Sequence, residues 1–179
     1  RGNGRSDRPT TQDAYSFDHY YADFVAVLDR LDIDRAAVVG ISVTAMTAIR
    51  LAHEQPERIS HLVLVGGWMD RRLADAAAAD AFAASLVRMR ENWPAFLDGF
   101  FGIVFNEPHS TKPYEDAVLD GWATDGDAVA MGMSGWMGHD MSSRAQTLTC
   151  PTLVIRGDRD ERVPYAQAEL AARLIPNAR

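Results

Sequence analysis

Cysteine, long apolar runs and excess positive charge are all scarce in this sequence. Its 179 residues include one cysteine, Cys150, which excludes an internal disulfide framework and any zinc site built from cysteines. No apolar run is long enough to span a bilayer. The formal net charge is -7, and no basic stripe is visible, so nucleic acid is excluded as the expected partner. We expect Cys150, beside Pro151 at a strand entrance, to be a small buried apolar residue.

The overall composition of the chain is that of a folded domain. Hydrophobic residues make up 47% and charged residues 24% of the chain, enough apolar surface for a sizeable core. The length suits one domain, or one domain with an insertion. The chain starts at Arg1 in a Gly-rich loop and ends at "LIPNAR" without a stop signal, so we expect an internal piece of a longer protein. Nothing indicates an oligomeric state, and no targeting signal fixes the compartment, for which we favour the cytoplasm.

The two flanks of the chain carry an alternation of helices and strands. Short apolar runs predict buried strands at 36–40, 61–65 and 152–156, the first of them buried on both faces. Helices are predicted at 43–54, where Pro56 stops the helix, and at 165–174. Another begins after Ser16, with apolar residues at helical spacing: Phe17, Tyr20, Tyr21, Phe24, Leu28 and Leu31. This order predicts an α/β fold, a mostly parallel sheet with flanking helices.

Residues 68–147 interrupt that alternation. They contain no convincing strand and predict several helices, including the alanine-rich 73–90, the segment 94–105 and two shorter ones within 113–140. All four tryptophans and six of the seven methionines fall in this stretch. We therefore divide the chain into a core, 1–67 and 148–179, and a helical cap, 68–147. The Gly-rich 125–138, "DGDAVAMGMSGWMG", is predicted to be a mobile segment for substrate entry.

Residues 38–46, "VVGISVTAM", contain most of a G-x-S-x-G nucleophile elbow. In that motif a buried strand turns sharply into a helix, and the residues two before and two after the serine must be small. Gly40 and Ser42 fit, but Thr44 stands at the second small position. We expect the β-branched Thr44 to crowd the elbow or widen the spacing of helix and strand, unless Ala45 and Ala48 compensate. The alternatives are an ordinary serine at a helix start, or an elbow that has lost catalysis.

Several further motifs, taken in their order along the chain, strengthen the interpretation of residues 38–46 as a nucleophile elbow. They are "RGNGRSDRP", "GISVT", "PERISHLVLVGG" and "PTLVIRGDRDERVP". In this order they resemble the α/β-hydrolase fold family, most closely its lidded esterases and cofactor-free haloperoxidase-like members. The resemblance covers about 1–67 and 148–179, and it implies a helical lid inserted after the sixth family strand. It also implies no cofactor and no metal.

The resemblance assigns roles to particular residues. Ser42 would be the nucleophile, Asp160 the acid that orients a histidine, and the N–H of Val43 one oxyanion donor. Asp158 in the same loop and Asp70 after the sixth family strand are alternative acids. Asp158 could instead be a turn residue that caps local N–H groups.

The histidine base is missing from the expected place. In this family the chain order is serine, acid, histidine, and no histidine follows Asp160. The five histidines are His19, His53, His61, His109 and His139. His109 and His139 in the cap could point into the site, although a structural role for them is the favoured interpretation. We therefore expect the 179-residue chain to be nearly inactive and the full-length protein to be active.

The leading hypothesis is a serine hydrolase that cleaves a carboxylic ester through an acyl-enzyme on Ser42. Cofactor-free haloperoxidase activity and carbon–carbon, lactone or amide hydrolysis stay open, as does a non-catalytic ligand-binding or regulatory domain. A small apolar acyl or aromatic ester substrate is indicated by the aromatic and methionine residues of the cap. These are Trp68, Trp93, Phe96, Phe100, Phe101, Phe105, Trp122, Met131, Met133, Trp136 and Met137.

Overall fold

The computed structural model describes residues 1–72, 75–109 and 111–179. The chain divides into two compact units. We call Arg1–Ser16 with Leu73–Met137 the helical unit, and Phe17–Arg72 with Gly138–Arg179 the sheet unit. Residues 73–74, where the predicted alanine-rich helix starts, lie outside the described residues.

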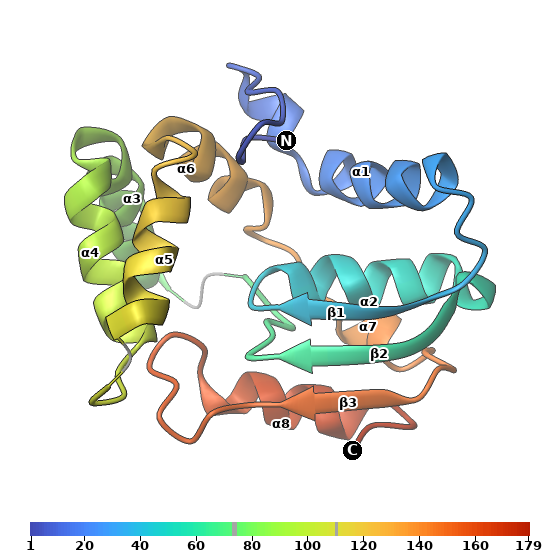
Figure 1. Ribbon diagram of the computed structural model, residues 1–179. Coiled ribbons are helices and arrows are strands. Elements are labelled where there is room, and N and C mark those ends of the chain that lie inside the picture. The colour runs from blue at the N-terminus through green and yellow to red at the C-terminus, as the bar shows by residue number, and fades with distance from the viewer. Residues whose placement is uncertain (73–74, 110) are drawn as a thin grey trace. The chain divides into compact units, whose positions relative to one another are not determined.

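The sheet unit is built on three parallel strands (Figure 1). These are β1 (Ala36–Ile41), β2 (Ile59–Val65) and β3 (Thr152–Ile155), in the spatial order β1-β2-β3. Helix α2 (Thr44–Glu54) connects β1 to β2, and the helices between β2 and β3 make the second crossover, so both strand pairs run parallel. Helix α8 (Tyr165–Leu174) follows β3. The predicted parallel sheet is confirmed. Near the end of the chain, Ala178 forms a further parallel bridge with Thr152 of β3.

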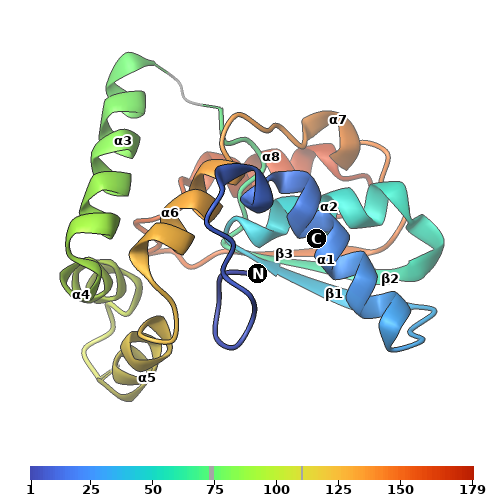
Figure 2. The same cartoon turned by 90° about the horizontal axis from the view of Figure 1, so that it is seen from above.

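The helices that contact the sheet lie on one of its faces (Figure 2). Helix α2 packs on β1 and β2, α8 packs on β3, and the short α7 (Ser142–Ala145) joins α2 to α8. Leu62 and Leu64 of β2 point into this layer and are 1% exposed. Because side chains alternate along a strand, the neighbouring residues point to the opposite face.

That opposite face of the sheet is apolar and exposed. Val39 and Ile41 of β1 are 58% and 59% exposed, and Leu153 and Ile155 of β3 lie in the same two cross-strand rows. The prediction that the first strand is buried on both faces is therefore wrong for the sheet unit. The hydrophobicity of residues 36–40 correctly indicated a strand. Whether one face of that strand is covered or both depends on the packing of other elements.

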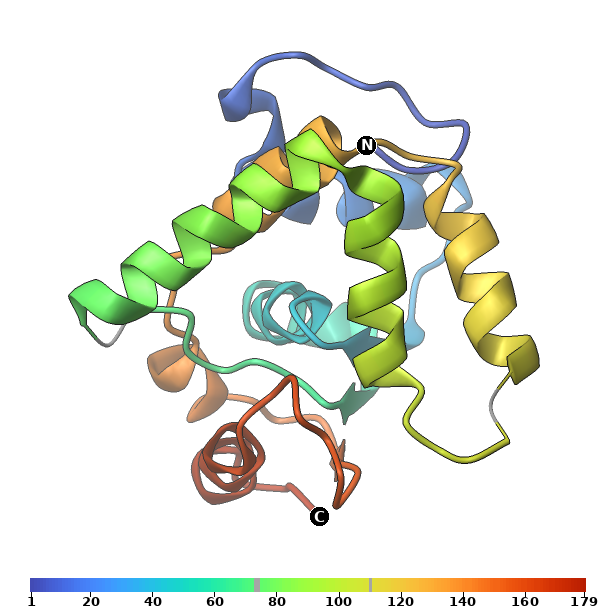
Figure 3. The same cartoon turned by 90° about the vertical axis from the view of Figure 1, so that its left-hand side faces the viewer.

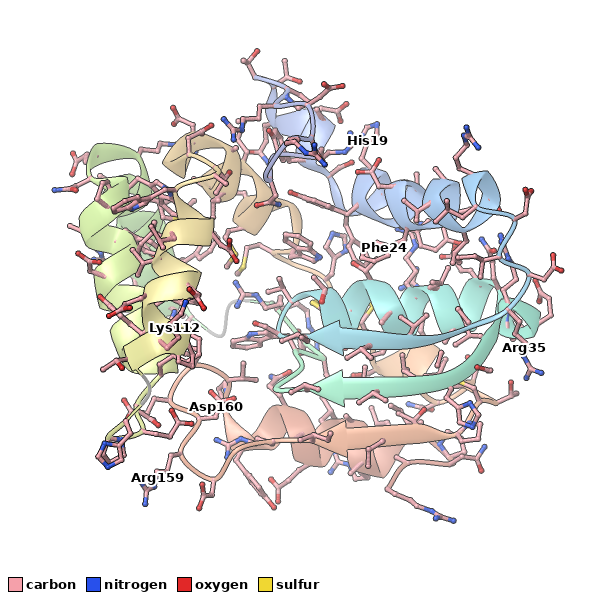
Figure 4. The ribbon with its side chains drawn as sticks, viewed as in Figure 1. His19, Phe24, Arg35, Lys112, Arg159 and Asp160 are labelled. Carbon is pink, nitrogen blue, oxygen red and sulfur yellow. The ribbon has the colours of Figure 1, made fainter. Side chains whose placement is uncertain are left out.

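Helix α1 (Phe17–Arg30) begins where the sequence predicts, immediately after Ser16. Only Phe17 of its apolar stripe is buried, and Phe24 is 42% exposed. Figure 4 labels Phe24 and His19 on this helix. Phe17 packs against the imidazole of His139, with the ring centroids 4.5 Å apart.

The helical unit contains the 3-10 turn η1 (Gln12–Tyr15) and the helices α3 (Ala76–Glu91), α4 (Trp93–Val104), α5 (Thr111–Gly121) and α6 (Gly126–Gly135). Within this unit α6 packs on α3 and η1, and α4 packs on α5 (Figure 3). Asp75, Asn92 and Asp125 cap α3, α4 and α6, since each side chain accepts a hydrogen bond from a first-turn N–H. Among the described residues between β2 and β3 there is no strand, as predicted.

The Gly-rich segment is a packed helix. Most of it forms α6, in which Gly126 and Gly132 are buried. A Cβ on Gly126 would lie 1.8 Å from the carbonyl oxygen of Met89, and one on Gly135 would lie 1.9 Å from that of Tyr15. These glycines permit close backbone contact within the helical unit. Packing therefore explains Gly126 and Gly135, and the role of the segment in substrate entry stays a prediction.

Candidate active site

The turn between β1 and α2 holds Ser42 in a conformation that L-residues rarely adopt. Its φ is +53°, and Asp32 is the other non-glycine residue with positive φ in the described part of the chain. Val43 already has helical φ and ψ, and α2 begins at Thr44. Backbone strain of this kind costs on the order of 1–3 kcal/mol and persists only where surrounding contacts fix it. The strand, the strained serine and the helix start together have the backbone geometry of the G-x-S-x-G turn, which we call the elbow.

Glycines allow the elbow to be this tight. A Cβ on Gly40 would lie 2.6 Å from the Cα of Ala45 in α2. On the other side of Ala45, a Cβ on Gly67 would lie 2.7 Å from the Ala45 Cβ. The first turn of α2 therefore packs closely against the ends of β1 and β2, through contacts that only small residues permit.

Thr44 does not occupy the crowded side of the elbow. The residue that meets Gly40 is Ala45, and Thr44 is partly exposed one position earlier on the helix. Its Oγ1 makes hydrogen bonds to the backbone of Ile41. The expected crowding is thus absent at Gly40, because the helical rotation of about 100° per residue turns the Thr44 side chain away from that contact.

Hydrogen bonds tie the backbone of Ser42 to the end of β2. Its N–H donates to the carbonyl of Val65 at 3.0 Å. Its own carbonyl accepts from the N–H of Trp68 at 3.1 Å and from that of Ala45 at 3.2 Å. Ser42 is partly exposed as a residue, although its backbone is held by these hydrogen bonds.

Asp160 lies in the loop beyond the carboxyl end of β3 (Figure 4). One carboxylate oxygen, Oδ1, accepts from the N–H groups of Arg162 and Val163, at 2.8 and 2.9 Å. The other, Oδ2, lies 3.1 Å from the place of a Cβ on Gly66. The guanidinium of Arg156 donates to the carbonyl of Asp160 at 3.0 Å and steadies the loop. The carboxylate is therefore oriented through one oxygen and leaves the other directed at the end of β2.

Ser42 and Asp160 flank the same strand end. Ser42 bonds to Val65, the last residue of β2, and Asp160 lies against Gly66, the next residue. The N–H of Gly66 in turn donates to the carbonyl of Ile155 at the end of β3, at 2.8 Å. The carboxyl edge of an open parallel sheet is where α/β proteins place their sites. The structure thus brings together two of the residues singled out in the sequence, with Val43 adjacent.

The alternative acids have different surroundings. Asp158 is exposed, and the N–H-capping role considered for it belongs to Asp160. Asp70 accepts hydrogen bonds from Arg72 on both carboxylate oxygens. Hydrogen bonding to the Arg72 side chain lowers the pKa of the Asp70 carboxyl, which keeps it ionised and paired.

The five histidines are placed in varied environments. His53 Nδ1 is 2.7 Å from Thr147 Oγ1, and the ring of His139 packs against that of Phe17 at an interplanar angle of 38°. His19 is partly exposed on α1. His61 is exposed on β2, and His109 is exposed in the helical unit. Within the described ranges, no three His, Cys, Asp or Glu side chains form a group that could hold a metal ion.

Some of the apolar residues predicted to surround a substrate form a row along α4. Trp93, Phe96, Phe100, Phe101 and Phe105 make successive ring contacts, with centroids 5.3 to 6.1 Å apart. The indole N–H of Trp93 donates to the carbonyl of Gly121. Trp136 is buried, whereas Trp122 is 60% exposed. Cys150 is buried, as expected.

Gln167 of α8 was not predicted from the sequence. Its Oε1 accepts from the N–H groups of Met69 and Asp70, at 2.8 and 2.9 Å. It thereby fixes the loop after β2, whose Trp68 N–H bonds to Ser42. A glutamine in a helix has no distinctive spacing, so only the tertiary structure identifies this contact.

Comparison with known proteins agrees with this geometry. A family model described as the alpha/beta hydrolase fold matches residues 1–179. The chain belongs to the α/β-hydrolase fold family. The parallel sheet, the flanking helices and the turn at Ser42 described above are consistent with this fold. In the part of the chain that the structure describes, no helix is both long and apolar enough to cross a bilayer.

Curated relatives match almost the whole chain at modest identity. A protein named putative carbamate hydrolase RutD, from Caulobacter sp. (strain K31), is 28% identical over 188 residues. A non-heme chloroperoxidase from Burkholderia pyrrocinia is 29% identical over 194 residues. The matches cover 99% of this chain and 67% and 68% of those proteins, so the chain spans about two thirds of their length.

Solved structures share the fold of this α/β hydrolase. An esterase from Exiguobacterium antarcticum superimposes with a TM-score of 0.88 at 20% identity, covering all of this chain and 68% of that one. A bromoperoxidase from Bacillus anthracis gives a TM-score of 0.86 at 21% identity, covering 99% and 68%. At such identities the likeness establishes the fold alone.

Proposed function

We propose that this α/β hydrolase is a serine hydrolase that cleaves carboxylic esters through an acyl-enzyme on Ser42. The observation that carries the proposal is the positive φ of Ser42 at the end of β1, beside the strand end that Asp160 also contacts. A strained, partly exposed serine at a helix start has no evident structural purpose. Its backbone cost is understandable if it presents the hydroxyl to a substrate.

The reaction would run in two halves. Ser42 Oγ attacks the acyl carbon, and a histidine whose positive form Asp160 stabilises takes the hydroxyl proton. The same histidine gives that proton to the leaving alcohol, which leaves an ester between Ser42 and the acyl group. Water, deprotonated by the histidine, then attacks this ester and releases the acid and free Ser42. The N–H of Val43, next to Ser42 at the start of α2, would donate to the oxyanion in both steps.

The proposed substrate is a small ester with an apolar acyl or aromatic part. The aromatic and methionine side chains within 68–147 support such a substrate, because together they offer a large apolar surface with adaptable methionine contacts. A second candidate is a carbamate or other C–N bond, because relatives at 26–28% identity are named putative carbamate hydrolases. Attack by Ser42 on the carbonyl carbon would be common to both.

Labelling tests the proposal directly. The natural protein that carries this sequence is treated with a fluorophosphonate, and the modified residue is located by mass spectrometry. Ser42 should be labelled, and Ser42→Ala should lose both labelling and turnover of p-nitrophenyl acetate. The matched control is Ser143→Ala, at an exposed serine of α7, which should leave both unchanged.

The outcome that contradicts the proposal is a folded natural protein in which Ser42 stays unlabelled. Turnover that survives Ser42→Ala would contradict it equally. Comparing p-nitrophenyl acetate with p-nitroacetanilide separates the two substrate classes, because acylation of Ser42 breaks a C–O bond in the first and a C–N bond in the second, each with release of a coloured leaving group.

A further inference from the structure

The hydroxyl of Thr44 binds both backbone groups of the residue before the nucleophile. Thr44 Oγ1 accepts from the N–H of Ile41 at 2.9 Å and donates to the carbonyl of Ile41 at 2.8 Å. A hydroxyl has one donor and two acceptor sites, so it can make both bonds at once. In the G-x-S-x-G pattern this position is a glycine, which has no side chain to make either.

These bonds lie on the side of β1 that faces away from β2. The N–H of Ser42 points toward β2, where it reaches the carbonyl of Val65. Backbone groups of successive residues in a strand point to opposite sides, so those of Ile41 point outward. The Thr44 side chain thus supplies the hydrogen-bonding partners for the outer side of β1 at its last residue.

The peptide unit between Ile41 and Ser42 is consequently held at both ends. Its carbonyl is bound by Thr44, and its N–H is bound by Val65. The orientation of this peptide unit determines the φ of Ser42, which is +53°. Rotation back to an unstrained φ would have to break one of these bonds. The following carbonyl, that of Ser42, is held by Trp68 and Ala45.

We propose that Thr44 is a positioning residue that maintains the strained backbone of Ser42 and so directs its hydroxyl at the substrate. The inference rests on the proposed role of Ser42 as nucleophile. The β-branched side chain restricts χ1, and one of the two rotamers that threonine adopts in a helix lets its hydroxyl bond the carbonyl three residues back, here that of Ile41. Thr44 is then a functional replacement for the usual glycine, and its removal impairs the reaction of Ser42 itself.

Three substitutions in the natural protein that carries this sequence test the role. Thr44→Val keeps the shape and removes the hydroxyl, Thr44→Ser keeps the hydroxyl, and Thr44→Gly restores the motif. The measurements are the rate constant of fluorophosphonate labelling and kcat and KM for p-nitrophenyl acetate. We expect Thr44→Val and Thr44→Gly to lower the labelling rate and kcat by about ten- to one-hundredfold, with KM changed by less than about threefold. Thr44→Ser should retain both within about threefold.

Thr47→Val is the matched control. It removes a threonine hydroxyl from the same helix one turn later, at a residue that is 1% exposed. Thermal melting of every variant shows that rates are compared on folded protein. We expect Thr47→Val to alter the melting temperature without lowering the labelling rate more than about threefold, because Thr47 lies in α2 one turn beyond the peptide unit of Ile41 and Ser42.

The results separate this inference from the proposed function. Normal labelling of Ser42 in a folded Thr44→Val variant would overturn the positioning role alone. A Thr44→Gly variant as fast as the unsubstituted protein, or faster, would overturn it too and show that Thr44 merely crowds the elbow. Absence of Ser42 labelling in the unsubstituted protein would overturn the proposed function, and the inference with it.

Discussion

A Cβ placed on Gly66 would lie 3.1 Å from the carboxylate oxygen Oδ2 of Asp160. Gly66 follows Val65, whose carbonyl accepts the N–H of Ser42. The end of β2 therefore lies between the proposed nucleophile, Ser42, and the proposed acid, Asp160. Because Gly66 has no side chain, the Asp160 carboxylate has room beside it. Gly66 also has a φ of +50°, so its place is constrained by conformation as well as by contact.

Substitution of Gly66 by alanine should impair activity more than stability explains. The positive φ costs an L-residue roughly 1–2 kcal/mol, and the new methyl group would press on Asp160. We expect kcat in the natural protein to fall about tenfold or more through displacement of the acid. Gly138→Ala is the control, because Gly138 has a φ of +80° but open space around it. Equal kcat losses in the two variants would contradict the role of the Gly66–Asp160 contact.

Asp160→Asn should keep the loop and lose the chemistry. Asparagine retains an oxygen that can accept from the N–H groups of Arg162 and Val163, but it cannot stabilise a positive histidine. We expect kcat for p-nitrophenyl acetate to fall on the order of 10²- to 10⁴-fold. Asp158→Asn, in the same loop but exposed, should change kcat less than about threefold. A larger loss of kcat in Asp158→Asn than in Asp160→Asn would contradict this prediction and identify Asp158 as the acid.

Gly40→Ala should disrupt the elbow by overpacking. The added Cβ would meet the Cα of Ala45 at 2.6 Å, and a backbone atom cannot move aside without shifting α2. We expect a loss of about 3 kcal/mol in the free energy of unfolding, measured with urea, and slower labelling of Ser42. Gly102→Ala, in α4 with no neighbouring atom within 4 Å, should instead be neutral or stabilising by up to about 1 kcal/mol. Comparable destabilisation by both would refute the packing argument.

Asp18 should contribute stability that acid removes. The Arg50 side chain, through hydrogen bonding and charge, lowers the pKa of the Asp18 carboxyl. A lowered pKa stabilises the folded state above the ordinary value near 4, and this contribution is lost as the pH falls through the folded pKa. Asp18→Asn should therefore destabilise at pH 7 by less than about 1 kcal/mol, because the carboxylate is largely exposed. Urea unfolding at pH 7 and pH 3 checks this; a difference that is larger at pH 3 has the wrong sign.

The exposed sheet face should make the 179-residue chain prone to aggregate. Val39 and Leu153 occupy one cross-strand row on that face, on either side of Val63. We expect poor solubility, and more soluble monomer after Val39→Lys with Leu153→Lys, as measured by sedimentation. A monodisperse unsubstituted chain that melts cooperatively would contradict the expectation.

The sequence by itself determined the parallel sheet and two residues of the candidate site. Apolar runs such as 61–65 between helical segments allow few other folds. The turn at Ser42 could be predicted because it depends on neighbouring residues, the apolar run before it and Gly40. The N-caps Asp75, Asn92 and Asp125 are equally local, because capping involves residues only three apart.

Tertiary structure decided what those local patterns leave open. Whether Thr44 crowds the elbow depends on which side chain faces Gly40, and rotation of α2 gives that place to Ala45. Exposure of Val39, the packing of α6 and the contact of Gln167 with the loop after β2 likewise depend on elements distant in the chain. The approach of Asp160 to Gly66 belongs to the same class, since it joins residues almost a hundred positions apart. The approach of Asp160 to Gly66 depends on the register of β2 and β3, which no window of sequence contains.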